Sequence, residues 1–107
     1  METTILVVED DPDLVEPMAD ILPRNFRFLV ATSVRDAESI IEGDQIDFAL
    51  VDLFLAGNQH GSALEPLLRA RNIPFAYMSG QPGAHFTKPF HPADLLTFVL
   101  SRIRDAA

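Results

Sequence analysis

Short runs of apolar residues alternate along the chain with longer segments that mix apolar and polar residues. Four of the runs are continuous rather than alternating: Ile5–Val8, Phe28–Ala31, Phe48–Val51 and Ile73–Met78. A continuous run predicts a strand buried on both faces, which is typical of a parallel sheet covered by helices. The pattern therefore predicts an α/β domain in which strands and helices take turns.

The segments between these runs carry helix signals. Asp11 followed by Pro12 predicts the start of a first helix, and Ser33 predicts the cap of a second. A third helix is expected over Ser62–Arg71 and a last one from Pro92 to about Arg104. The predicted order is strand and helix in alternation, with a helix at the end.

Polar residues with related chemistry follow the apolar runs. Glu9 and Asp10 follow the first run, Asp52 the third and Ser79 the fourth, and Lys88, the only lysine, comes later. In an open parallel sheet, functional residues gather at the carboxyl ends of the strands. Acids, a hydroxyl and a lysine in this order are what a metal-dependent phosphorylation of an aspartate requires.

Asp52 is the expected phosphoacceptor, since a carboxylate can attack a phosphoryl group as a nucleophile. The transfer needs positioning and neutralisation of the phosphate oxygens. Mg²⁺ suits this task because it prefers oxygen ligands and takes one or two carboxylates. The expected ligands are Asp10 directly, Glu9 through a water, Asp52 itself and the backbone carbonyl of Phe54.

The lysine and the hydroxyl complete the predicted site. Lys88 would pair with Asp52 before the transfer and with a phosphate oxygen afterwards, because a compact ammonium moves easily between such partners. Ser79 would donate its hydroxyl to another phosphate oxygen. Taken singly, each residue has an ordinary explanation, such as a helix cap for Asp10 or a turn for Ser79. Their joint order after successive strands favours the chemical interpretation.

Composition narrows the classes of function. The 107 residues suffice for one domain with one core. The absence of cysteine excludes disulfides and thiolate chemistry. A net charge of −8 with scattered arginines argues against direct binding of nucleic acid, and we expect no membrane segment because no apolar stretch is long enough. A cytoplasmic protein is the expectation.

With these residues in view, the chain resembles a response-regulator receiver domain, the aspartate-phosphorylated part of two-component signalling. The first strand with its acid pair, the segment Ala49–Gly57 around Asp52 and the motif Lys88-Pro89-Phe90 carry the resemblance. It implies a flavodoxin-like, doubly wound sheet of five parallel strands in the order 2-1-3-4-5, flanked by helices. It also implies a single receiver domain over residues 1–107, without an effector domain.

The stretch Pro74–Gly80 is similar to the Pro-Phe-x-Phe-Ala-Thr-Gly signature of a receiver subgroup, the FATGUY receivers. Members are often stand-alone receivers whose donors resemble HWE-type histidine kinases. Here Ser79 replaces the threonine of the signature, so the hydroxyl is kept. The resemblance implies a histidine kinase or a phosphotransfer protein as the donor and a downstream protein as the target.

The chain departs from the family between Ser79 and Lys88, which are only nine positions apart. Because a helical crossover takes about a dozen residues, the fourth helix is predicted to be missing, with a short loop and a short strand over Ala84–Thr87 in its place. The face of the fourth strand, fifth strand and last helix would then be uncovered, which suggests a homodimer or a kinase-docking groove. His85 is expected to act with Ser79 as a switch residue.

Two other functions stay open on the sequence alone. The first is a pseudo-receiver, a binding module that is not phosphorylated, which the shortened segment keeps in view. The second is a small magnesium-dependent phosphohydrolase with an aspartyl intermediate. Against it, Phe54 stands where such enzymes place a second acid, and so short a chain leaves little room for a substrate pocket. We therefore expect no enzyme beyond self-catalysed gain and loss of the phosphoryl group.

Overall fold

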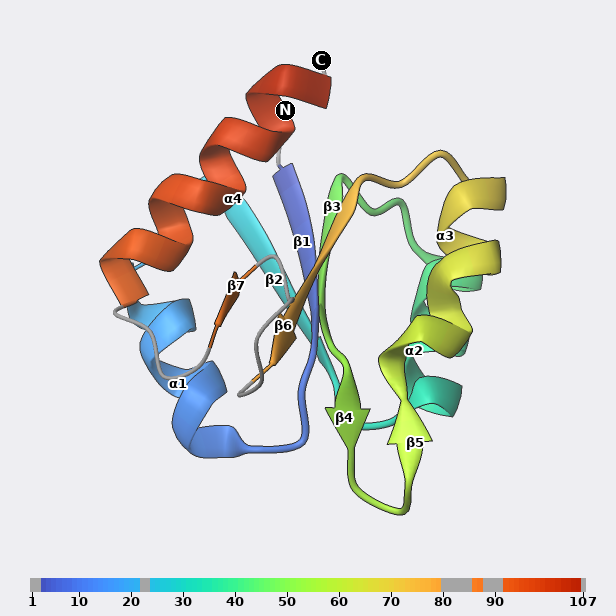
Figure 1. The fold of residues 1–107 in the computed structure, drawn as a ribbon. Coiled ribbons are helices and arrows are strands. Elements are labelled where there is room, and N and C mark those ends of the chain that lie inside the picture. The colour runs from blue at the N-terminus through green and yellow to red at the C-terminus, as the bar shows by residue number, and fades with distance from the viewer. Residues whose placement is uncertain (1–2, 22–23, 80–85, 88–91, 107) are drawn as a thin grey trace.

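The computed structural model describes residues 3–21, 24–79, 86–87 and 92–106, which form a central sheet between two pairs of helices (Figure 1). The strands of the sheet are β1 (Thr3–Val8), β2 (Phe26–Ala31), β3 (Phe48–Asp52), β6 (Phe75–Ser79) and β7 (Phe86–Thr87). The helical segments are α1 (Pro12–Ile21), α2 (Val34–Gly43), the 3₁₀ turn η1 (Gly61–Leu64), α3 (Glu65–Ala70) and α4 (Pro92–Ala106). A separate hairpin consists of β4 (Phe54–Leu55) and β5 (Gln59–His60).

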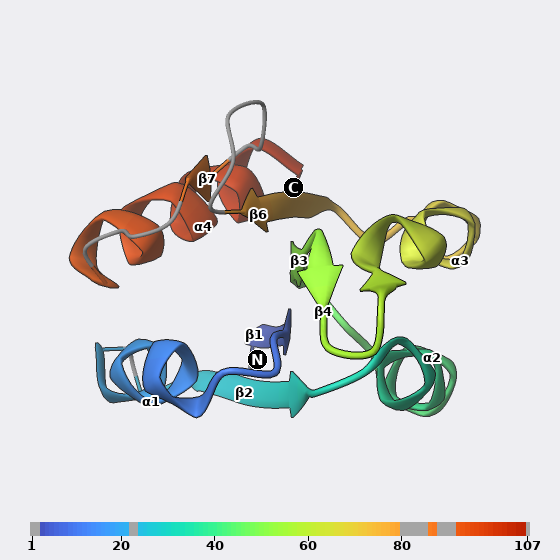
Figure 2. The ribbon, with the colours of Figure 1, turned by 60° about the horizontal axis from the view of Figure 1, so that its bottom comes forward.

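All neighbouring strands of the central sheet are parallel, and their order is β2-β1-β3-β6-β7. With β6 and β7 as the fourth and fifth strands, this confirms the predicted order 2-1-3-4-5. Figure 2 shows that α1 and α4 cover one face of the sheet and that α2 and α3 cover the other. This two-sided arrangement is typical of a doubly wound sheet, in which the strand order reverses direction at β1.

Each face of the sheet has its own apolar core. Alternate residues of β1 divide between the two cores: Leu6 and Val8 pack with residues of α2 and α3, whereas Ile5 and Val7 pack with residues of α1 and α4. All residues of β3 are buried, as predicted for a central strand. The same prediction is wrong for β2, where Val30 is 37% exposed, because this strand lies at the edge of the sheet.

Local signals set the first two helix starts as predicted. At α1, Asp11 Oδ1 accepts a hydrogen bond of 3.0 Å from the N–H of Asp13. At α2, Ser33 Oγ accepts one of 3.1 Å from the N–H of Asp36. These bonds satisfy N–H groups that have no partner inside the helix.

Among the helices that the structure describes, none is long and apolar enough to cross a membrane.

The third helix differs from its prediction over residues 62–71. Residues Gly61–Leu64 form a 3₁₀ turn, and the α-helix covers only Glu65–Ala70. Pro66 explains the later start, since a proline is tolerated in the first turn of an α-helix but not in its interior.

Several predictions fall on residues outside the described ranges. The predicted absence of a fourth helix concerns residues 80–85, and Lys88 and His85 also lie in the gaps. Of the short fifth strand predicted over Ala84–Thr87, the described residues contain Phe86–Thr87, which form β7. It pairs in parallel with the end of β6, with Thr87 opposite Ser79.

Candidate functional site

Three acidic side chains meet at the carboxyl ends of two neighbouring strands. Glu9 and Asp10 follow β1, and Asp52 is the last residue of β3. The strands β1 and β3 are neighbours in the sheet (Figure 1). One carboxylate oxygen from each residue lies within 4.8 Å of the others. The structure therefore brings together the three carboxylates that the sequence analysis singled out.

Most of this acid cluster is buried. Glu9 is 2% exposed and Asp52 is 3% exposed, while Asp10 reaches solvent. Carboxylates this close repel one another, and removal from water makes the charges more costly. A set of carboxylate oxygens with one side open to solvent is a donor set that Mg²⁺ prefers. The residues present thus fit a bound Mg²⁺ ion.

Backbone amides hold the acids in place. Among the described residues, Ala56 donates its N–H to Asp10 Oδ2 at 2.9 Å, Phe54 to Asp52 Oδ1 at 3.2 Å, and Asp11 to Glu9 Oε1 at 3.1 Å. Two of the three donors belong to the segment that follows β3, so this segment and the acids form one unit. Sequence reasoning missed the donors because a backbone N–H is present at nearly every position and gives no signal of its own.

The segment after β3 forms the β4–β5 hairpin, which the sequence analysis did not predict. Its turn contains Gly57 and Asn58 with φ of 75° and 59°. Glycine and asparagine are the residues that tolerate this left-handed backbone, so their adjacency was the available signal. Phe54 is 47% exposed, and its ring packs edge to face with that of His60 at 5.2 Å. The role of the Phe54 carbonyl as a metal ligand stays a prediction.

Ser79 lies next to the acid cluster. β6 is the neighbour of β3, with Met78 opposite Asp52, and Ser79 follows as the last residue of the strand. The serine is 1% exposed. Its contact with phosphate, and the roles of Lys88 and His85, stay predictions.

A second polar contact joins β6 to α3. The hydroxyl of Tyr77 donates to Oε1 of Glu65 at 2.7 Å, and Nε of Arg69 donates to Oε2 at 3.2 Å. The hydrogen bond from Tyr77, and after it the one from Arg69, lowers the pKa of Glu65. Burial, and after it the hydrogen bond to Glu65, raises the pKa of Tyr77. The contact connects the strand that carries Ser79 to α3.

The raised pKa of Tyr77 predicts how the domain responds to alkali. The pKa of Tyr77 in the folded state lies above its value in the unfolded chain, which is about 10. The stabilisation that this difference provides is therefore complete at a pH below the unfolded-state pKa. It is lost as the pH rises through the folded-state pKa. Tyr77→Phe should remove this alkaline loss of stability. Tyr77 is the only tyrosine and tryptophan is absent, so the ultraviolet absorbance of phenolate reports on it alone. A phenolate that forms at the pH of free tyrosine would contradict the prediction.

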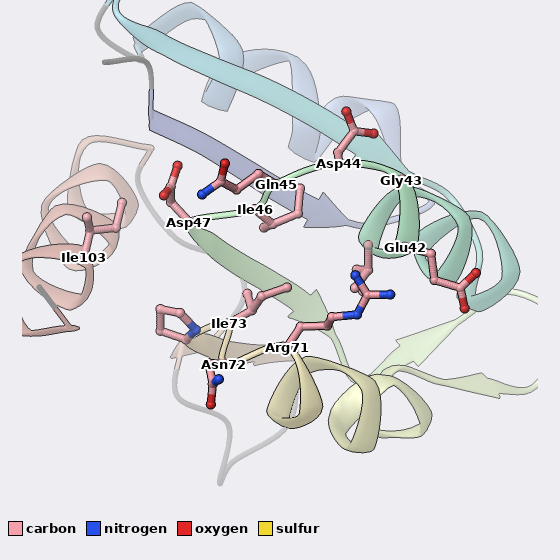
Figure 3. A pocket seen from close by; sticks show the side chains of 12 residues that line it. Glu42, Gly43, Asp44, Gln45, Ile46, Asp47, Arg71, Asn72, Ile73 and Ile103 are labelled. Atoms are coloured by element: carbon pink, nitrogen blue, oxygen red, sulfur yellow. The ribbon is translucent and has the colours of Figure 1, made fainter.

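A hollow of about 660 Å³ lies at the opposite end of the sheet (Figure 3). Its lining includes Gln45 and Asp47, just before β3, and Asn72 and Ile73, before β6. Asp47 accepts a hydrogen bond of 2.7 Å from the N–H of Thr4, which gives this acid a structural role. Since the hollow lies at the amino ends of the strands and the acid cluster at their carboxyl ends, the hollow is not part of the candidate site.

The chain is similar to several known proteins in structure and to one in sequence. The chain is similar to a CheY-like response regulator receiver domain protein from Methanospirillum hungatei, with a TM-score of 0.87 and 21% identity over 99% of this chain and 97% of the other. The anti-anti-sigma factor PhyR from Bartonella quintana matches with a TM-score of 0.76 and 23% identity over 98% of this chain and 48% of the other. In sequence, the heme response regulator HssR of Staphylococcus saprophyticus is 31% identical over an alignment 110 residues long, which covers 88% of this chain and 48% of the relative. No family model matches.

The sheet order and the site at its carboxyl edge define a doubly wound α/β domain of the CheY-like type. The relative found by sequence and the structural matches support a response-regulator receiver domain. The chain spans about half the length of the curated relative that it matches. The resemblance drawn from the sequence and the predicted fold class are confirmed.

Proposed function

We propose that this receiver domain is a phosphorylation switch that takes a phosphoryl group onto Asp52 from a histidine kinase or a phosphotransfer protein. Glu9, Asp10, Asp52 and the carbonyl of Phe54 would hold Mg²⁺. The observation that supports this most is the acid cluster, with carboxylate oxygens within 4.8 Å at the carboxyl ends of β1 and β3. When bound, Mg²⁺ supplies positive charge that offsets the acids and the phosphate oxygens.

The residues of the chain then have distinct tasks. An oxygen of Asp52 attacks the phosphorus atom, the bond from phosphorus to the donor breaks, and an acyl phosphate forms. The N–H of Phe54, 3.2 Å from Oδ1, orients the carboxylate for this attack. Ser79 and Lys88 would bind phosphate oxygens, and His85 would move with Ser79 as the switch.

The output of such a switch is a changed protein contact. We place the domain in the cytoplasm as a single receiver over residues 1–107 that acts through a downstream protein. It has no substrate turnover beyond gain and loss of its own phosphoryl group. The face of β6, β7 and α4 is the proposed homodimer surface. A covalent modification shifts a conformational equilibrium only if it stabilises one of the two conformations more than the other. The phosphoryl group on Asp52 must therefore make more favourable contacts in one conformation than in the other.

A second candidate function is a binding module that works without phosphorylation. Its support is the structural similarity to PhyR from Bartonella quintana, which is called an anti-anti-sigma factor. The buried acid cluster favours the first candidate, since a module that only binds proteins has no need for three carboxylates so close together.

Intact-mass measurement after incubation with acetyl phosphate and Mg²⁺ tests the proposal. The native chain should gain one phosphoryl group only when Mg²⁺ is present, and Asp52→Ala should gain none. Asp20→Ala removes an exposed acid of α1 and should behave like the native chain. If neither acetyl phosphate nor a set of histidine kinases modifies the native chain, the binding module becomes the better account.

A further inference from the structure

The β4–β5 hairpin connects the acid cluster to a helix that has no part in the proposed chemistry. From its turn, the N–H of Ala56 donates to Asp10 Oδ2 at 2.9 Å. From β5, the side-chain oxygen of Gln59 accepts a hydrogen bond of 3.0 Å from the N–H of Val34, the first residue of α2. One short hairpin thus contacts both a proposed metal ligand and the start of α2.

The hairpin depends on its anchors for its shape. Two strands of two residues each cannot hold a conformation by their own pairing. The end of the hairpin nearest the sheet is held by two contacts. Leu55 is 6% exposed within the apolar core, and Gly61 donates its N–H to the carbonyl of Leu53 at 3.0 Å. The turn, in contrast, is exposed at residues 56–58. Gln59 follows this turn directly, so its bond to α2 is an anchor close to the Ala56 amide.

We propose that Gln59 is a positioning residue of the metal site. By holding β5 against the first turn of α2, Gln59 keeps the Ala56 N–H on Asp10, and this N–H sets the orientation of the carboxylate toward the cation. An oxygen acceptor suits the place, because the first N–H groups of a helix have no partner within the helix. Groups that orient a metal ligand commonly tune its affinity. The inference rests on the proposed function, since it presumes that Asp10 holds Mg²⁺.

Two variants at this position separate the hydrogen bond from the bulk of the side chain. Gln59→Met keeps a similar length but removes the acceptor, and we expect its dissociation constant for Mg²⁺ to rise about two- to tenfold, as the loss of one hydrogen bond implies. Gln59→Glu keeps an acceptor oxygen. Measured at an ionic strength that screens the added charge, it should bind Mg²⁺ at least as well as the native chain does.

Ser33→Ala is the matched control for a general loss of stability. It removes the cap at the same end of α2, where Ser33 Oγ accepts from Asp36, but it leaves the hairpin contacts unchanged. Cap removal costs about 1 kcal/mol, yet the affinity for Mg²⁺ should stay at the native value. Hydrogen exchange at the Ala56 amide gives a readout without metal. We expect faster exchange in Gln59→Met and native exchange in Ser33→Ala.

The experiment is titration of Mg²⁺ followed by nuclear magnetic resonance on the native chain and the three variants. Weaker binding and faster Ala56 exchange in Gln59→Met alone would support the positioning role. Native affinity in Gln59→Met, or an equal loss in Ser33→Ala, would overturn the role while leaving the proposed function intact. If the native chain itself binds no Mg²⁺, the positioning role and the proposed metal site fail together.

Discussion

The substitution Gly61→Ala is expected to destabilise the folded domain by about 3 kcal/mol. A Cβ atom at this position would overlap the backbone carbonyl oxygen of Asp52 and lie 2.5 Å from Cγ1 of Val51. The oxygen belongs to the backbone of the central strand β3, so it cannot turn away as a flexible side chain would. Because Asp52 is the proposed phosphoacceptor, the variant should also take up less phosphate, even where it remains folded.

Chemical denaturation of the native chain and Gly61→Ala measures the effect, and Gly43→Ala is the matched control. Position 43 is the last residue of α2, and an added Cβ there has nothing within 4 Å. Since alanine favours a helix over glycine, the control should be stabilised by up to about 1 kcal/mol. If Gly61→Ala were as stable as the native chain, then position 61 would have room for a Cβ atom beside the backbone of Asp52, and the prediction would be wrong.

Mg²⁺ is expected to stabilise the native chain against heat, and the substitution Asp52→Asn should remove most of this effect. A ligand that binds only the folded state adds about 2.7 kcal/mol at a hundred times its dissociation constant. Asp52→Asn replaces one of the three clustered carboxylates with an amide, which is a weaker ligand for a hard cation. Phosphorylation should be lost altogether, because an amide is not a nucleophile of the required kind.

Thermal unfolding with and without Mg²⁺, at equal ionic strength, measures this effect. Glu38→Gln changes the net charge by the same amount at an exposed position of α2, so it should keep the full stabilisation. Removal of the cation by a chelator should return the native chain to its starting midpoint. If Asp52→Asn is stabilised as much as Glu38→Gln, then Mg²⁺ binds somewhere other than the acid cluster.

The sequence by itself determined the architecture of this domain and the neighbourhood of its acids. Continuous apolar runs such as Phe48–Val51 predicted buried parallel strands, and β3 is buried throughout. Once the strands are parallel, residues that directly follow them must gather at one edge of the sheet. For this reason the order of residues along the chain was enough to predict that Asp10 and Asp52, although far apart in sequence, lie close together.

Tertiary structure alone decided how the site is supported. The bond from Val34 to Gln59 spans 25 positions, and the bond from Tyr77 to Glu65 spans 12. The donor to Asp10 is the backbone amide of Ala56. Nearly every residue type has such an amide, so the residue type at position 56 does not indicate this role. The exposure of β2 follows from its place at the edge, which depends on the order of all the strands. A sequence shows the type of each residue, whereas contacts such as these depend on which residues become neighbours when the elements pack.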